Sequence, residues 1–217
     1  MRKLFVFLLA AVFSVFTVFA AAGEEEPEKH WSGDFIYIVQ ADGTAKIEIY
    51  NGQKEKCEIP VQLDGHRVAS IGDCAFAYHD SLASVTIPDS VLELGYGVFV
   101  GCQSLKEIIV SPDHPTMAAV DGALCSKADK RLITFPMASG KTEYTIPQGT
   151  KEIGEYAFYD CKNLTAITIP DSVTKIGMDS FFGCGDLMCR VGRDSYAMQY
   201  CIDHGMNYTM MEEGLPE

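Results

Sequence analysis

An internal repeat constrains the fold of this chain more than any other feature of its sequence. The segments Ser81–Cys102 and Asn163–Cys184 are identical at 11 of 22 aligned positions, and both contain the run Thr-Ile-Pro-Asp-Ser-Val. Phenylalanines keep a period of 23 residues within each half of the chain, at Phe76, Phe99, Phe158 and Phe181. A fixed period of this length is typical of proteins built from stacked structural units, so we expect a solenoid.

Two departures from the period predict where the solenoid is irregular. Phe99 and Phe158 are 59 residues apart, which exceeds two periods by 13. In the first copy Ile59 and Ile71 are 12 residues apart, whereas the corresponding residues of later copies are 7 apart. We therefore expect one lengthened early coil and one copy that carries an insertion.

Each repeat unit can be understood as a short coil of chain. Val85 and Ile87 alternate with polar residues, which is the pattern of a strand with one buried face. Pro88 lacks the N–H that a continuing strand would need, so the strand ends there. A second short strand and a turn with the recurrent Phe complete the unit. No unit can bury its apolar face alone, and stacking the units makes one continuous core.

The pattern TIPDSVxxIGxxxFxxCxxL resembles the BspA-type (treponemal-type) leucine-rich repeat, which is common in bacterial surface and secreted proteins and in some parasitic protists. The resemblance implies a β-rich solenoid with short helical turns, an α/β leucine-rich repeat arranged as a right-handed stack of about five coils. The implied segments are an N-terminal β-hairpin cap at 35–56 that turns at Asp42-Gly43, a solenoid at 57–189 with a hairpin excursion near 111–142, and a C-terminal helix and strand cap with its tail at 190–217.

The pattern of the C-terminal segment agrees with this resemblance. The Asp194-Ser195 pair suits the N-cap of a helix, and Gly205 follows its expected last turn. In the last copy, Arg190 and Gly192 stand where earlier copies have the apolar pair of the strand. We expect this coil to end the stack with a polar outer side.

The N-terminus predicts export. Arg2 and Lys3 precede a run of apolar and small residues, and Glu24–Glu26 follow it. This is the order of a secretory signal peptide, so we expect residues 1–22 to be cleaved. The alternative is an uncleaved anchor, because the apolar run approaches the ~20 residues that span a membrane. Residues 23–34 are expected to form an acidic, disordered leader.

The charge balance excludes several classes of partner. The chain has 30 acidic and 17 basic residues, and its formal net charge is −13. Cleavage of the signal peptide would remove two basic residues and leave −15. Binding to phosphate backbones or anionic membranes needs clustered Lys and Arg. We therefore expect no nucleic-acid partner and no membrane insertion after signal cleavage.

The eight cysteines have two interpretations in an exported chain. Cys102, Cys161 and Cys184 occupy the same repeat position, so we expect them to point into the core as a column of free thiols. A disulfide within the column is the alternative, although parallel Cα–Cβ bonds do not direct neighbouring sulfurs at each other. Cys189 and Cys201 are the more favourable pair for a disulfide. The sequence assigns no partner to Cys57, Cys74 or Cys125.

No catalytic, metal or cofactor site is predicted. A Cys74–His79 nucleophile pair is disfavoured, because His79 occupies the repeat position that Cys holds in other copies. The recurrent Asp-Ser pairs lie at equivalent turns, and the sequence has no glycine-rich phosphate loop or calcium loop. Two Asp-His pairs lack a third ligand at a suitable spacing. They are Asp113-His114 and Asp203-His204. We predict a protein that is not an enzyme.

The outward side of the first strands is the predicted binding surface. Alternation along each strand places one polar row away from the core, as a flat and mildly acidic face. The alternative is a threonine ladder that only favours strand geometry and solubility. The predicted partner-binding residues are Ser84, Thr86, Glu107, Ile109, Glu143, Thr145 and Thr168.

The resemblance implies a function in recognition, because members of this family are associated with adhesion, host or matrix binding, and cell–cell contact. We expect a secreted or cell-surface leucine-rich repeat module that binds a protein or glycan partner on a host or neighbouring cell surface. The alternatives are a structural, envelope-associated protein and an accessory factor or inhibitor of a secreted enzyme.

Overall fold

The computed structural model describes residues 27–211. The predicted signal peptide lies outside the described residues, as do the first four residues of the predicted leader. In chain order the elements are β1 (Lys29–Ser32), β2 (Phe35–Val39), β3 (Ala45–Tyr50), β4 (Lys56–Glu58), β5 (Gln62–Leu63), β6 (His66–Ile71), β7 (Ser84–Ile87), β8 (Glu93–Leu94), β9 (Glu107–Val110), β10 (Met117–Val120), β11 (Ala123–Ser126), β12 (Arg131–Thr134), β13 (Glu143–Thr145), β14 (Glu152–Ile153), β15 (Ala166–Ile169), β16 (Lys175–Ile176), β17 (Met188–Val191), α1 (Tyr196–His204) and β18 (Asn207–Met210).

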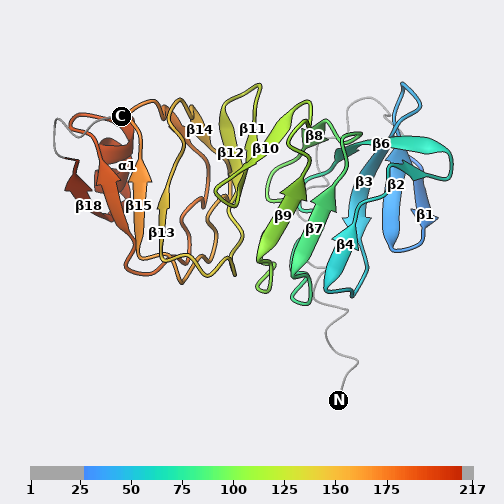
Figure 1. The fold of residues 1–217 in the computed structure, drawn as a ribbon, viewed down its shortest axis with the longest axis horizontal. Coiled ribbons are helices and arrows are strands. Elements are labelled where there is room, and N and C mark those ends of the chain that lie inside the picture. Colours follow the sequence, from blue (N-terminus) through green and yellow to red (C-terminus); the bar gives the residue numbers. More distant parts are fainter. Residues whose placement is uncertain (1–26, 212–217) are drawn as a thin grey trace, which may run out of the picture.

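The strands stack along the long axis of the molecule as the rungs of a β-solenoid (Figure 1). The first strands of the coils form two parallel sheets, in the orders β4-β7-β9 and β13-β15-β17-β18. The second strands pair in parallel through β3-β6-β8 and through β12-β14-β16. Parallel ladders form because each coil repeats the path of the previous one. The predicted fold class is confirmed.

The solenoid has about seven turns, more than the five or so that the sequence suggested. The repeat pattern indicates only the coils that carry its recurrent residues. At the N-terminal end β3 pairs in parallel with β6, and at the C-terminal end β18 pairs in parallel with β17. Each end therefore adds a rung that the repeat pattern does not mark.

The recurrent aromatic side chains lie one above another in the core. The ring centroids of Phe76 and Phe99 are 5.4 Å apart, and those of Phe158 and Phe181 are also 5.4 Å apart. Phe135 precedes Phe158 by one period, and its ring stacks on that of Phe158 at 5.4 Å. The copy with the insertion therefore keeps a core aromatic residue of its own, and successive units do lie on top of one another.

The N-terminal cap is larger than predicted. β2 and β3 form the expected hairpin, in which the hydroxyl and the backbone N–H of Thr44 donate hydrogen bonds to Asp42 Oδ1. β1 pairs antiparallel with β2, so the prediction that Lys29–Ser32 belong to a disordered leader is wrong. This apolar-poor segment is ordered because the edge of β2 offers its backbone a row of partners. The ring of His30 also lies 5.3 Å from that of Tyr37.

The insertion forms a wall between two halves of the core. β10 and β11 make the expected hairpin, which turns at Asp121-Gly122, and β11 pairs antiparallel with β12. Successive residues of these strands point to opposite faces, so each strand contributes to two different clusters of buried side chains. Leu124 and Ile133 belong to the N-terminal cluster, whereas Ala123, Cys125 and Leu132 belong to the C-terminal cluster.

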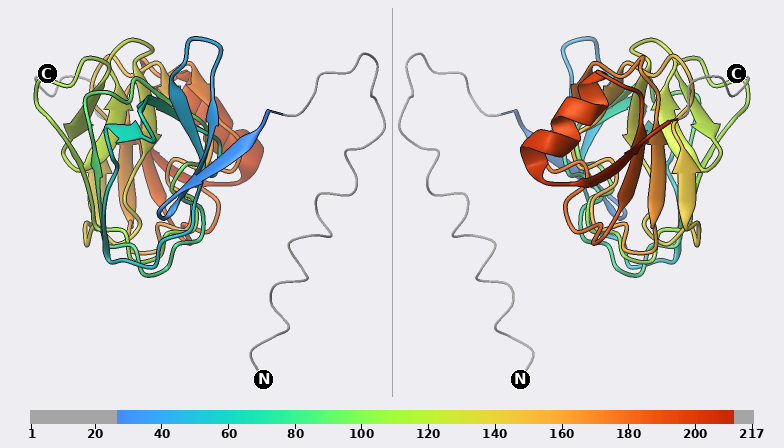
Figure 2. Two further views of the ribbon diagram at one scale, coloured as in Figure 1. Left: turned by 90° about the vertical axis from the view of Figure 1, so that its right-hand side faces the viewer. Right: turned by 90° about the vertical axis from the view of Figure 1, so that its left-hand side faces the viewer.

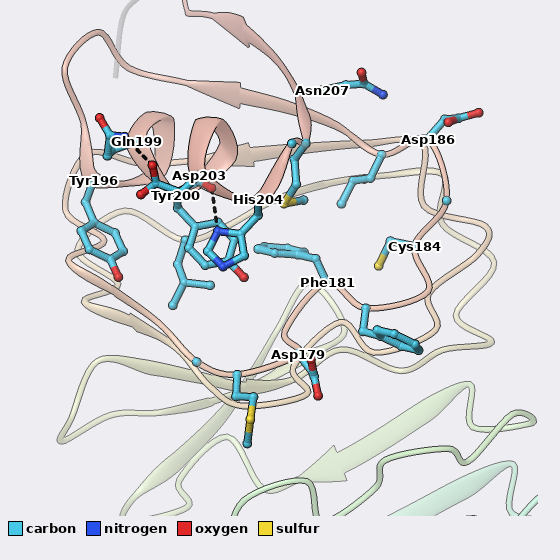
Figure 3. A pocket seen from close by; sticks show the side chains of 18 residues that line it. Asp179, Phe181, Cys184, Asp186, Tyr196, Gln199, Tyr200, Asp203, His204 and Asn207 are labelled. Atoms are coloured by element: carbon cyan, nitrogen blue, oxygen red, sulfur yellow. Dashed lines mark hydrogen bonds between the residues drawn. The ribbon is translucent and has the colours of Figure 1, made fainter.

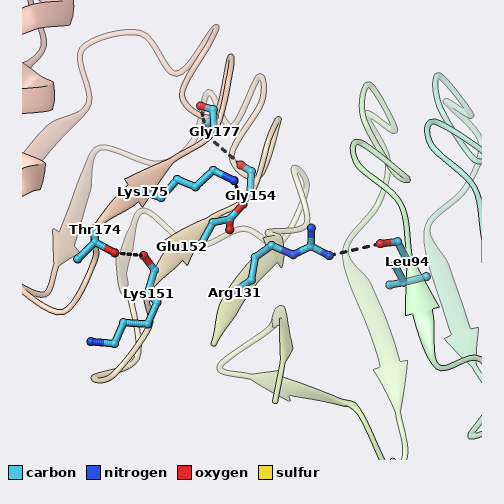
Figure 4. A network of polar contacts seen from close by, with 9 residues as sticks. Leu94, Arg131, Lys151, Glu152, Gly154, Thr174, Lys175 and Gly177 are labelled. Atoms are coloured by element: carbon cyan, nitrogen blue, oxygen red, sulfur yellow. Dashed lines mark hydrogen bonds and ion pairs between the residues drawn. The ribbon is translucent and has the colours of Figure 1, made fainter. Parts of the chain in front are cut away.

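Both ladders are interrupted at this wall. β9 and β13 belong to different sheets, and so do β8 and β12. Arg131 crosses the interruption, because its Nη2 donates to the carbonyl oxygen of Leu94 at 3.3 Å (Figure 4). Its guanidinium carbon also lies 5.2 Å from the centre of the Tyr96 ring. The backbone N–H of Ala138 donates to the carbonyl oxygen of Leu105, which makes a second link.

Helix α1 closes the C-terminal end, where it lies against the last coils (Figure 2). The side chain of Ser195 accepts a hydrogen bond from the backbone N–H of Met198, and Gly205 ends the helix in the left-handed conformation. Both capping positions are those predicted. Ala197 and Cys201 are the buried residues of the helix.

Strand β17 corrects one prediction about the last copy. Cys189 and Val191 fill the buried positions, and Arg190 points outward between them. The prediction that Arg190 and Gly192 replace the apolar pair is wrong, because this coil has one residue fewer before its strand than the preceding copy. A shift of one residue exchanges the two faces of a strand.

Candidate functional site

The predicted binding residues lie on the outer side of the first-strand sheets. Their neighbours within the strands, such as Val85 and Tyr144, are buried, so the outward orientation follows from alternation. Glu107, Ile109, Glu143 and Thr145 are exposed, whereas Ser84, Thr86 and Thr168 are partly buried.

The seven residues form two patches. The N-terminal patch comprises Ser84, Thr86, Glu107 and Ile109 on β7 and β9, and the C-terminal patch comprises Glu143, Thr145 and Thr168 on β13 and β15. Direct strand pairing brings the members of each patch together. No ladder joins the two patches within the described residues, because the insertion separates β9 from β13.

The C-terminal patch contains an ion pair that the sequence did not indicate. Arg190 of β17 reaches past β15, and its Nη1 lies 2.8 Å from Oε2 of Glu143. This hydrogen bond and the positive charge of the guanidinium lower the pKa of the Glu143 carboxyl. Because both side chains are exposed, the pair adds little stability. It neutralises one acidic charge of the predicted surface.

A large cavity, which we call the cap cavity, lies at the C-terminal end and shares no residue with the two patches. It has a volume of about 840 Å³ and lies between α1 and the turn that joins β16 to β17 (Figure 3). The side chains that matter most for its chemistry are Met178, Asp179, Phe181, Phe182 and Asp186 from the turn and Tyr196, Gln199, Tyr200, Asp203 and His204 from α1.

Helical spacing places the α1 side chains along one wall of the cavity. Tyr196, Tyr200 and His204 follow one another at intervals of four residues, which is the spacing of one helix face. The rings of Tyr200 and His204 stack with centroids 3.9 Å apart, and the ring of Phe181 meets that of Tyr200 edge-on at 6.2 Å. Next to them, Gln199 Nε2 donates to Asp203 Oδ1 at 2.7 Å. This wall is therefore aromatic with a carboxylate beside it.

The opposite wall of the cavity is formed by the turn of the last repeat, between β16 and β17. Asp179 has a left-handed backbone conformation at φ 52°. The corresponding residues of other copies, Cys74, Gly97 and Tyr156, share this conformation. The left-handed residue is thus a property of the repeat turn. In the last copy this residue is an aspartate, and it lines the cavity on the side opposite α1 (Figure 3).

All eight cysteines are free, and seven of them are buried. The prediction of inward free thiols at Cys102, Cys161 and Cys184 is confirmed. The disulfide predicted between Cys189 and Cys201 is not formed. Their thiols are close enough to interact, and this interaction raises the pKa of Cys189 and lowers that of Cys201. Packing of α1 against β17 thus brings the two residues together as thiols.

Cys74 is the exposed cysteine. Partial burial and the neighbouring carboxylate of Asp73 raise the pKa of its thiol, which is opposite to the activation that a nucleophile requires. His79 Nδ1 faces the backbone carbonyl oxygens of Phe76 and Ala77, at 3.1 and 3.0 Å. The His79 ring is therefore fixed by hydrogen bonding to backbone atoms of its own coil.

His114 of the Asp113-His114 pair has a structural environment. It is fully buried, and its Nδ1 accepts hydrogen bonds from the backbone N–H groups of Thr116 and Met117. Within residues 27–211, no group of three or more His, Cys, Asp or Glu side chains is arranged to hold a metal ion. In the same part of the chain, no helix has the length and apolar character needed to cross a membrane.

Sequence reasoning assigned no role to the cap cavity. The tyrosines and histidine at intervals of four in α1 are a signal that could have indicated an aromatic helix face. The Asp203-His204 pair by itself indicates at most an incomplete set of metal ligands. The packing of this face opposite the last repeat turn depends on the direction in which the chain enters α1, which no local pattern encodes.

Parallel two-strand coils, a hairpin cap and a closing helix define a leucine-rich repeat protein. The family described as "BspA type Leucine rich repeat region" matches residues 51–119 and 134–191, in six copies. The chain belongs to this family. The interval between the two matched regions contains β11 and most of β12. These strands form the wall between the N-terminal and C-terminal clusters of buried side chains.

Several solved structures are similar to this chain. A leucine-rich cell surface protein from Faecalibacterium prausnitzii is 18% identical, with 78% of this chain and 77% of that chain covered and a TM-score of 0.44. A leucine-rich repeat protein from T. pallidum is 26% identical, with 75% and 71% covered and a TM-score of 0.49. The pneumococcal vaccine antigen PcpA is 17% identical, with 77% and 70% covered and a TM-score of 0.47. No curated protein matches the chain.

Proposed function

We propose that this protein is an exported, non-catalytic recognition module that binds a protein or glycan partner at a cell surface. The observation that carries the proposal is the division of the molecule into an apolar interior and long outer faces. The recurrent Phe and Cys side chains are buried in the core, whereas the polar side chains of β7, β9, β13 and β15 face outward. Membership of the leucine-rich repeat family supports a binding role.

The two outer patches are the proposed contact surface. Each patch consists of paired strands of a sheet, so its side chains are held at fixed spacings by the buried core behind them. A rigid surface loses little conformational freedom when a partner binds, which favours affinity. Because the patches are separate, we propose that a partner contacts one or both as independent areas.

A capture experiment with the full chain tests this function. The protein is used to capture partners from culture supernatant or host matrix, and bound proteins and glycans are identified by mass spectrometry. Thr86→Arg combined with Thr168→Arg places a bulky charge on each patch and should abolish capture without unfolding the protein. The single variants show which patch is used.

A matched pair of variants controls for added charge. Gln103→Arg with Thr174→Arg adds the same two charges at exposed positions outside the patches. If the patch variant and the control variant capture the partner equally well, the patches have no role in binding. If the wild-type protein binds nothing saturably, the structural, envelope-associated alternative replaces the proposed function. Stoichiometric capture of one secreted enzyme would favour the accessory or inhibitor alternative.

A further inference from the structure

We propose that the cap cavity binds a basic peptide segment of a partner protein, with a Lys or Arg side chain held between aromatic rings and carboxylates. This site is separate from the two strand patches. Binding at the cap cavity can therefore be tested separately from binding at the strand patches.

The first observation is the set of uncovered rings. Phe182 is 60% exposed and Tyr196 is 45% exposed, and they line opposite sides of the cavity. Met178 is also 60% exposed, and it lines the cavity as well. The Phe182 ring stacks on that of Tyr159 at 5.4 Å, so a neighbouring side chain supports it from behind. Large apolar side chains grouped around a hollow are typical of a binding surface.

The second observation is uncompensated negative charge. Asp179, Asp186 and Asp203 line the cavity, and none of the residues that line it is Lys or Arg. None of the three carboxylates takes part in an ion pair within residues 27–211. The acidic side chains of the cavity therefore have no basic partner among the residues that line it.

Rings and carboxylates together select a cation. The faces of Tyr and Phe attract Lys and Arg side chains within about 6 Å of the ring centre. Carboxylates at the rim add hydrogen bonds to the cationic head, while the rings contact its aliphatic or planar stem. A neutral ligand would leave the acidic side chains around the cavity without a basic partner. The net charge of −13 also favours the approach of a basic partner.

The size of the cavity argues for a peptide segment in place of a single small cation. Its volume of about 840 Å³ is close to the upper end of ligand pockets, which is about 1,000 Å³. One ammonium or guanidinium group would fill a small part of this space. A segment with two or more side chains would contact both α1 and the repeat turn.

Binding of a fluorescein-labelled tetra-arginine peptide to the full chain, followed by fluorescence anisotropy, tests the proposal. A labelled tetra-citrulline peptide has nearly the same shape without the charge and serves as the control ligand. Asp179→Asn combined with Asp203→Asn should weaken binding of tetra-arginine about tenfold. Asn tolerates the left-handed conformation of residue 179, so the repeat turn is preserved.

A second pair of variants distinguishes the effect of the cavity carboxylates from the effect of the overall negative charge. Asp89→Asn with Asp113→Asn removes two exposed carboxylates outside the cavity and should change the affinity for tetra-arginine less than twofold. Phe182→Leu keeps an apolar side chain but removes the ring, and should weaken binding about threefold to tenfold.

The proposal is overturned if tetra-citrulline binds as well as tetra-arginine, if wild-type protein binds neither, or if the two Asp pairs have equal effects. Thr86→Arg with Thr168→Arg should leave peptide binding within twofold, which separates this site from the strand patches.

Discussion

The thiol of Cys184 donates a hydrogen bond to the backbone carbonyl oxygen of Phe158, at 3.0 Å, from one coil to the preceding one. Cys102 makes the same contact with the carbonyl oxygen of Phe76, at 2.9 Å. Each carbonyl oxygen also has a partner in its own coil, namely the backbone N–H of Cys161 for Phe158 and the ring of His79 for Phe76, so the thiol adds a second hydrogen bond between coils. The recurrent cysteine is therefore a small apolar side chain that also makes a hydrogen bond to the neighbouring coil.

Replacement of Cys184 by Ala should destabilise the protein more than replacement of Cys161. Cys161 Sγ lies 3.9 Å from the carbonyl oxygen of Phe135, so its removal costs mainly packing. We expect Cys184→Ala to lower the free energy of unfolding by about 1–2 kcal/mol, and by about 0.5–1 kcal/mol more than Cys161→Ala. Urea denaturation measures both values. Cys184→Ser keeps a donor and should recover part of the loss, and equal effects of the two Ala variants would contradict this role.

Only one thiol should react in the native protein. Cys74 is exposed and the other seven cysteines are buried, so a thiol reagent should label one residue under native conditions and eight after denaturation. Labelling at neutral pH should be slow, because the pKa of the Cys74 thiol is raised. Mass spectrometry after alkylation counts the modified residues. Cys74→Ser should abolish native labelling, and detection of a Cys189–Cys201 disulfide after denaturation without reductant would contradict the thiol pair.

Leu124 and Leu132 should stabilise different halves of the solenoid. They lie on neighbouring strands of the insertion, but Leu124 belongs to the N-terminal cluster and Leu132 to the C-terminal cluster. Each change to Ala should cost about 2–5 kcal/mol. Hydrogen exchange should show that Leu124→Ala reduces amide protection mainly at 45–110 and that Leu132→Ala reduces it mainly at 143–201. The two variants are matched controls for each other, and the same exchange pattern in both would show that the wall does not divide the core.

Alkaline pH should destabilise the protein. Burial raises the pKa of four thiols from 9.0 to about 11, namely those of Cys57, Cys102, Cys125 and Cys184. Because the folded state favours the neutral thiols, their contribution is complete below about pH 9 and is lost as the pH rises from about 9 to about 11. The urea midpoint should therefore fall over this interval. Cys102→Ser removes one of these groups and should make the fall shallower, whereas a constant midpoint would rule out this linkage.

Much of the fold could be predicted from short-range pattern. The recurrent Phe and the alternation in Val85–Ile87 indicated stacked coils, because each copy repeats both signals in the same order. The turn at Asp42-Gly43 and the caps of α1 at Ser195 and Gly205 were also predictable, since each depends on the conformation of a few consecutive residues.

The candidate sites were less predictable. The outward orientation of Thr86 and Thr168 followed from alternation, but their division into two patches depends on how the insertion packs between β9 and β13. The shift of one residue in β17 moved Arg190 outward, where it meets Glu143 two strands away. The repeat pattern showed a departure at Arg190 and Gly192, but a coil with a polar outer side and a coil that lacks one residue give the same signal.

By itself, the sequence determined that this chain is a stack of repeats with a free-thiol column and a cap at each end, because these features repeat or depend on neighbouring residues. Only the tertiary structure decided that Lys29–Ser32 are ordered, that β11 and β12 divide the core, and that α1 faces Asp179 across a cavity. Those features join segments that are distant in the sequence. Their contacts are set by how whole elements pack, and that packing is not written in any one of the segments.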